Sequence, residues 1–198
     1  MSSRMNRRLV LSGLTALGIV GLSGPVFAFS TAQAEKLIDK AVADINKIIN
    51  SGKSEAAMFV DFERLFGKYA DSGRIGQLVL GPDGRSASAS QKTAFTNAFQ
   101  TYMSRKYGRR FREFIGGKVV VEGAKPIKSF YEVKTTAILK GEPPFEVLFV
   151  VADDSGRFID IVIEGISLVK AERTEIGAML DKRKGNLDQL IMDLKTAG

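Results

Sequence analysis

The spacing of apolar residues along the chain changes from a helical period to a strand period and then back again. Between residues 31 and 50, apolar residues recur every three or four positions, which predicts a helix with one apolar face. Ser30 or Thr31 is suited to cap its first turn. The same spacing predicts further helices over residues 55–69, 75–80 and 91–114.

Apolar and polar residues alternate from residue 117 onward, which is the pattern of half-buried strands. Four such segments are separated by short turns, and they cover residues 118–121, 130–139, 145–151 and 157–164. The turn before the third strand contains Pro143 and Pro144, and the turn before the fourth reads Asp153-Asp154-Ser155-Gly156. Because sequential strands on short turns pair antiparallel, we expect an antiparallel meander.

The last strand leads directly into another helical segment. Ile159, Ile161 and Ile163 share one face of this strand, and Asp160 and Glu164 lie on the other. After the glycine that follows, apolar residues recur every three or four positions up to residue 180. We therefore expect the sheet and this helix to be in contact, with the space between them filled by side chains or by a bound molecule.

These elements predict a single α+β domain over residues 29–198. We expect a twisted antiparallel sheet of about four strands, with several helices packed over one of its faces. The helical half covers about residues 29–116, the sheet 117–165 and the C-terminal helices 166–196.

Residues 1–28 have the organisation of an export signal. Three arginines precede an apolar stretch, and Val26-Phe27-Ala28 supplies a cleavage site of small residues. The stretch is short and contains Gly and Ser, which favours a cleaved signal over an uncleaved membrane anchor, the alternative. We expect cleavage near Ala28 and a mature protein in the periplasm, reached by either the general or the twin-arginine route.

The composition excludes most catalytic and metal chemistry. Of 198 residues, 44% are hydrophobic and 26% charged, as in a globular domain, and none is Cys or His. The usual thiolate and imidazole nucleophiles, general bases and zinc, haem or iron–sulfur ligands are therefore missing. Asp153 and Asp154 have the oxygens for a hard cation, but adjacent acids in such a turn are typical turn formers. We expect no catalytic residue, no metal site and no cofactor.

Basic residues exceed acidic ones, and they concentrate in one segment. The formal net charge is +7, and without the three arginines of the export signal 26 basic residues face 22 acidic ones, which leaves +4. This mild excess favours an anionic partner and falls short of a nucleic-acid-binding surface, which the export signal also disfavours. The end of the 91–114 helix carries five bases: Arg105, Lys106, Arg109, Arg110 and Arg112. They either complement the helix dipole and solvate the surface, or form a collar for phosphate head groups or an anionic membrane.

Two groups of residues are similar to those of one known family. The first is Asp160-Ile161-Val162-Ile163-Glu164-Gly165-Ile166-Ser167-Leu168, followed by Arg173. The second combines Ile75-Gly76-Gln77-Leu78-Val79-Leu80-Gly81 with Ser88-Ala89-Ser90-Gln91 and Phe95. Over about residues 37–194 the chain thereby resembles the MlaC family, also called toluene-tolerance proteins, which are periplasmic phospholipid-binding partners of an ABC transporter.

The resemblance implies an apolar cavity between sheet and helices. This cavity would hold the acyl chains of a glycerophospholipid, with the head group near solvent. An aromatic stripe at helical spacing is ordinarily core, and it is the resemblance that implies a cavity wall here. The wall residues that we expect are Phe99, Tyr102, Met103, Val133, Val147, Phe149, Ile161, Ile163, Ile166 and Val169. The resemblance also implies docking on an inner-membrane ABC transporter complex and an outer-membrane lipoprotein complex, and we expect a monomer.

Two other functions remain open from the residues themselves. An enzyme acting on a small apolar substrate would need Asp160 or Glu164 to face the cavity, and both lie opposite the isoleucine face. A membrane-surface or peptide adaptor would use the basic helix end and have a fully packed interior.

Overall fold

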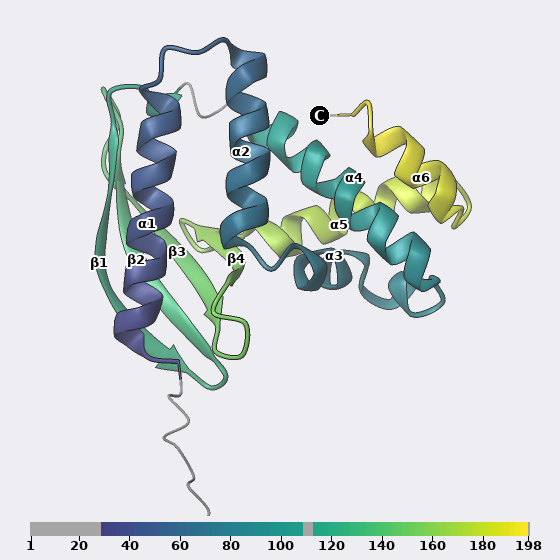
Figure 1. Ribbon diagram of the computed structural model, residues 1–198. Helices are drawn as coiled ribbons and strands as arrows, with labels where there is room; N and C mark the ends of the chain where they lie inside the picture. The colour runs from purple at the N-terminus through teal and green to yellow at the C-terminus, as the bar shows by residue number, and fades with distance from the viewer. Residues whose placement is uncertain (1–28, 109–112, 198) are drawn as a thin grey trace, which may run out of the picture.

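The computed structural model describes residues 29–108 and 113–197 (Figure 1). The expected export signal and three of the five bases, Arg109, Arg110 and Arg112, lie outside the described residues. The elements follow in the order α1 (Thr31–Ile49), α2 (Glu55–Tyr69), α3 (Ser72–Leu80), the 3-10 helix η1 (Gly81–Arg85), α4 (Ala89–Gly108), β1 (Lys118–Ile127), β2 (Phe130–Ile138), β3 (Phe145–Ala152), β4 (Phe158–Ile163), β5 (Ile166–Ser167), α5 (Leu168–Lys182) and α6 (Leu187–Leu194).

The α+β fold and the antiparallel meander are confirmed. The sheet has the order β1-β2-β3-β4-β5, and every neighbouring pair is antiparallel. Its fifth strand has only two residues and extends the four expected strands at one edge. Side chains of Val133, Thr135 and Ala137 point to the helix-covered face and are fully buried. On the other face, Lys134 pairs with Glu122 and Glu146 at 3.3 and 3.6 Å.

The expected helix over residues 91–114 corresponds to α4, which is described as far as Gly108, and residues 109–112 lie outside the described residues. A Cβ atom at Gly108 would lie 2.4 Å from Cδ1 of Phe59, so the close approach of α2 requires a glycine here. Of the expected collar, the described bases Arg105 and Lys106 lie in the last turn of α4.

Helix α1 lies along the sheet, with α2 beside it (Figure 1). Ser30 caps α1 as expected, since its hydroxyl accepts a hydrogen bond from the Gln33 amide and the Gln33 side chain accepts one from the Ser30 amide. Ala34, Ile38 and Ala41 face the sheet and are buried.

The remaining helices, α3 to α6, form a lobe to one side of the sheet (Figure 1). The lobe is joined to the sheet where the Asp71 amide donates to the Phe158 carbonyl at 2.9 Å. Helix α3 crosses α4 closely at Gly76, where a Cβ would lie 2.7 Å from Oγ1 of Thr96. Within residues 29–108 and 113–197, no helix is both long and apolar enough to cross a membrane.

Candidate functional site

Nine of the ten expected wall residues belong to one apolar cluster between sheet and helices. We call the ten residues the helix–sheet seam. Five of them are buried, namely Phe99, Tyr102, Val133, Val147 and Phe149. Four more are partly buried against the same cluster: Met103, Ile161, Ile163 and Val169. Side chains from β2, β3, β4, α4 and α5 thus meet on one face of the sheet, which periodicity alone did not identify.

The seam reaches solvent at one edge of the sheet. Cα pairing places Thr135, Val147, Ile163 and Ile166 in one row across β2, β3, β4 and β5. The exposed fraction rises along this row, from 0% at Thr135 and 8% at Val147 to 64% at Ile166. The row therefore runs from the buried interior to a solvent-exposed apolar side chain at the edge strand β5.

The interior of the seam is packed by aromatic rings. The rings of Phe95 and Phe99 stack with centroids 5.6 Å apart, and those of Phe149 and Phe158 meet edge to face at 5.8 Å. Phe66 of α2 meets Phe158 in the same way, also at 5.8 Å. Phe66 and Phe158 were not among the expected wall residues, although both occupy apolar positions of their elements.

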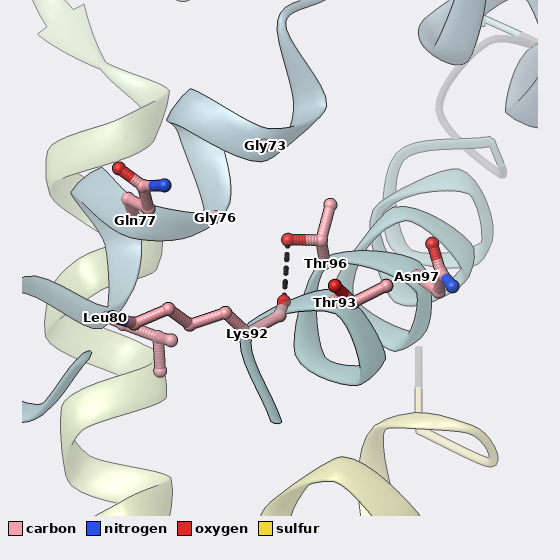
Figure 2. Close-up of a pocket in the computed structure, with 8 residues that line it drawn as sticks. All are labelled: Gly73, Gly76, Gln77, Leu80, Lys92, Thr93, Thr96 and Asn97. Atoms are coloured by element: carbon pink, nitrogen blue, oxygen red, sulfur yellow. Dashed lines mark hydrogen bonds between the residues drawn. The ribbon is translucent and has the colours of Figure 1, made fainter. Parts of the chain in front are cut away.

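Two hollows lie away from the seam. One of about 280 Å³ lies between α3 and α4, over Gly73 and Gly76, and Figure 2 shows Lys92 extending across it toward Leu80. The other, of about 460 Å³, lies near the turn between α5 and α6 and contains Asp188. The second hollow is lined mainly by polar surface, and neither is lined by any of the ten seam residues.

Asp160 holds the start of α5 against the sheet. Its carboxylate accepts hydrogen bonds from the Ser167 hydroxyl at 2.5 Å and from the Val169 amide at 3.0 Å. Ser167 in turn caps α5 by accepting from the Lys170 amide at 3.1 Å. The carboxylate that an enzyme would use as an acid is thus engaged in ordering a helix terminus.

A cluster of charged and phenolic side chains joins α4 to α5; of its members, only Tyr102 and Lys106 were among the expected site residues, and in other roles. We call it the Glu172 cluster; it comprises Tyr102, Lys106, Tyr107, Glu172 and Glu175. The Lys106 ammonium lies 2.7 Å from Oε1 of Glu172 and 2.5 Å from Oε2 of Glu175. The Tyr107 hydroxyl donates to Glu172 at 2.5 Å, and that of Tyr102 donates to Glu175 at 2.7 Å.

Burial and hydrogen bonding shift the pKa values of this cluster. Burial raises the pKa of Tyr102 to about 12, and its hydrogen bond to Glu175 adds to the rise. Burial also raises the pKa of Tyr107, with its hydrogen bond to Glu172 acting in the same direction. Burial opposes the charge on Lys106, but hydrogen bonds to Glu172 and Glu175 outweigh it and raise the pKa. Lys106 is therefore a permanent cation and both tyrosines are neutral donors at neutral pH.

Neither described base of the expected collar projects freely into solvent. Lys106 lies within the Glu172 cluster. Arg105 donates from Nη1 to the carbonyls of Lys195 and Ala197, at 2.5 and 3.2 Å, and so holds the C-terminal segment against α4. Within the two described ranges, no group of three acidic side chains is placed to hold a metal ion.

Comparisons with known proteins agree with this architecture. A family model described as MlaC protein matches residues 36–196. Among solved structures, the fold is similar to that of a phospholipid-binding protein from Ralstonia solanacearum, determined in complex with a phospholipid. The TM-score is 0.69 at 20% sequence identity, and the match covers 81% of this chain and 98% of the other.

Proposed function

Because this chain belongs to the MlaC protein family, we propose that it is a phospholipid carrier of the periplasm. The acyl chains of the lipid occupy the helix–sheet seam and the head group stays near solvent. The observation that carries this proposal is the apolar row that ends at the exposed Ile166. The solved structure of similar fold was determined with a phospholipid, which supports this class of ligand.

A protein carrier removes the large free-energy cost of exposing the acyl chains of a phospholipid to water. Each methylene group of an acyl chain costs about 0.8 kcal/mol to expose to water, so two long chains cost on the order of 20 kcal/mol or more. Crossing an aqueous compartment unaided is negligible at such a cost. A protein that replaces the water contact with apolar side chains makes the transfer feasible without any covalent step.

Lipid entry requires the two sides of the seam to separate. Small-molecule pockets usually have volumes of about 300 to 1,000 Å³, and here aromatic and aliphatic side chains fill the seam. The contacts that must part are apolar, such as those around Ile163 and Val169. Acyl chains entering at Ile166 replace them with equivalent apolar contacts, so the exchange requires little net free energy per unit of buried area.

Further aspects follow from the same proposal. The carrier is exported, and it docks on an inner-membrane ABC transporter complex and on an outer-membrane lipoprotein complex. A carrier needs no catalytic residue, and Asp160, one of the two acids considered for catalysis, is engaged at the start of α5. The adaptor function is disfavoured because Arg105 and Lys106 are bound to carbonyl and carboxylate oxygens of the protein itself.

The experiment uses one strand and both of its faces. Ile163→Trp adds bulk inside the seam, and we expect the lipid that copurifies per protein molecule, measured by mass spectrometry after solvent extraction, to fall several-fold. Val162→Trp is the matched control, since Val162 is the adjacent residue of β4 and points to the opposite face. Equal lipid content in the two variants, with circular dichroism showing both folded, would contradict the assignment of the seam as the chain-binding site. Absence of any lipid from the unmodified protein would contradict the function itself.

A further inference from the structure

A carboxylate interrupts the apolar face of α5. Glu172 lies in the same buried stripe as Ile176 and Leu180, and only 1% of its surface is exposed. Its Oε1 accepts hydrogen bonds from Lys106 and Tyr107, whereas its Oε2 is buried and has no hydrogen-bond partner. A buried carboxylate oxygen without a hydrogen-bond partner costs folding free energy. Its presence at this position therefore indicates that it binds a ligand or has another specific role.

The cluster around this oxygen carries excess negative charge. Lys106 shares its single positive charge between Glu172 and Glu175, and hydrogen bonds of the two tyrosines add no charge. Among its five residues the sum is one negative charge. The Lys106 ammonium also lies 5.3 and 5.5 Å from the ring centroids of Tyr102 and Tyr107, so two aromatic faces border the same space. Carboxylates and aromatic faces both favour a cation.

Tyr102 connects this cluster to the helix–sheet seam. Its ring lies 6.1 Å from that of Phe99 in the apolar interior, and its hydroxyl donates to Glu175. The cluster reaches solvent at its other end, where the side chains of Lys106 and Glu175 are 27% and 48% exposed. A ligand with apolar chains in the seam and a polar head near solvent would meet the cluster at the boundary between the two.

We propose that the Glu172 cluster binds the primary ammonium group of a phospholipid head group, as in phosphatidylethanolamine. The ammonium donates to Oε2 of Glu172, the buried oxygen that has no hydrogen-bond partner. This inference rests on the proposed function, because the opening of the seam that admits the acyl chains also gives access to Oε2. An ammonium-binding site of this kind makes the protein selective for amine-bearing over amine-free phospholipids.

The test measures head-group preference with a variant that keeps the shape of the side chain. Protein stripped of lipid is incubated with vesicles containing equal amounts of phosphatidylethanolamine and phosphatidylglycerol with identical chains. Mass spectrometry then gives the ratio of the two lipids bound. We expect the unmodified protein to be enriched in the amine lipid, and Glu172→Gln to lower that ratio by about tenfold, as expected for losing one hydrogen bond between charged groups. The total lipid bound per protein should change little.

Two further variants make the result decisive. Glu63→Gln is the matched control, because Glu63 also accepts a hydrogen bond from a side chain of α4, the Thr101 hydroxyl, but lies outside the cluster. It should leave the ratio unchanged. Glu175→Gln removes a more exposed charge of the cluster and should lower the ratio less than Glu172→Gln, which keeps the test valid if that variant does not fold.

The outcomes separate this inference from the proposed function. Lipid bound with no amine preference, or a preference that Glu172→Gln leaves intact, overturns the head-group site and leaves the carrier function standing. A purely structural cluster would lower the melting temperature of the variants without changing the lipid ratio, which also overturns the site. Failure of the unmodified protein to take up either lipid contradicts the carrier function.

Discussion

At the scale of single residues, one carboxylate joins the first two helices. Oδ2 of Asp44 in α1 accepts hydrogen bonds from the Lys68 ammonium at 2.8 Å and the Tyr69 hydroxyl at 2.7 Å, both at the end of α2. The hydrogen bond from Lys68, followed by that from Tyr69, lowers the pKa of Asp44 from 3.8 to about 2. The charged form of Asp44 is therefore favoured by folding.

This shift predicts how acid affects stability. Because the folded-state pKa is the lower one, the stabilisation is complete above the unfolded-state value of 3.8 and is lost as the pH falls through about 2. Asp44→Asn cannot titrate, so its deficit in unfolding free energy relative to the unmodified protein should shrink over this range. Urea denaturation at a series of pH values measures the difference. A deficit that stays constant down to about pH 2 would contradict the assignment.

At the scale of elements, helix α5 is fixed at its first turn by a strand. Ser167 caps the helix, and Asp160 of β4 binds both the Ser167 hydroxyl and the Val169 amide. Because α5 carries Val169 and Glu172, this connection positions both the seam and the Glu172 cluster. A helix N-terminus with positive partial charge is also a favourable place for the Asp160 carboxylate.

Removal of the Ser167 cap should lower the free energy of unfolding more than removal of an ordinary N-cap residue does. Ser167→Ala removes the cap and also one donor to Asp160, so we expect about 1.5 to 2 kcal/mol of destabilisation, at the upper end for N-cap replacement. Ser54→Ala is the matched control, since Ser54 caps α2 through the Ala57 amide alone, and we expect about 0.5 to 1 kcal/mol there. Equal losses in urea denaturation would show that Asp160 adds nothing to the cap.

At the scale of the whole molecule, a sheet covered by α1 meets a lobe of four helices along one apolar boundary (Figure 1). The residues of this boundary are buried or partly buried, whereas Ile166 of the short strand β5 is exposed. A sheet edge is where main-chain pairing ends and where two layers part most easily. We therefore place the entrance for lipid at this edge.

This placement predicts a kinetic defect without a loss of stability. Ile166→Ser should slow uptake of a fluorescent phospholipid from vesicles several-fold, while unfolding free energy changes by less than about 0.5 kcal/mol, as for other exposed positions. Met192→Ser is the control, because Met192 of α6 is 62% exposed, against 64% for Ile166, and lies away from the seam. Equal uptake rates for the two variants would mean that lipid enters elsewhere.

Much of this architecture could be predicted from local patterns. The bounds of α2 and the cap of α1 agree with the sequence-based expectation, because a helix period and an N-cap hydroxyl act within a few residues. Alternation likewise identified which residues of β3 share a face, such as Val147 and Phe149, which are both buried. The close packing of Phe59 on Gly108 could not be predicted in this way, since Phe59 comes from a distant part of the chain.

Some features of the candidate site could likewise be predicted from local patterns, whereas others depend on contacts between distant segments. The sequence by itself determined which side chains are apolar and which of them share a face, and nine of the ten seam residues meet in one cluster. In the sequence, the Glu172 cluster was indicated only by a charged residue, Glu172, at an apolar position of a helical period. Its partner Lys106 lies 66 residues earlier in the chain, so their contact could not be read from the local pattern. Tertiary structure alone decided that pairing, the turn of Arg105 toward the C-terminus and the exposure of Ile166. The reason is that periodicity specifies neighbours within an element, whereas contacts between elements depend on how complete surfaces pack.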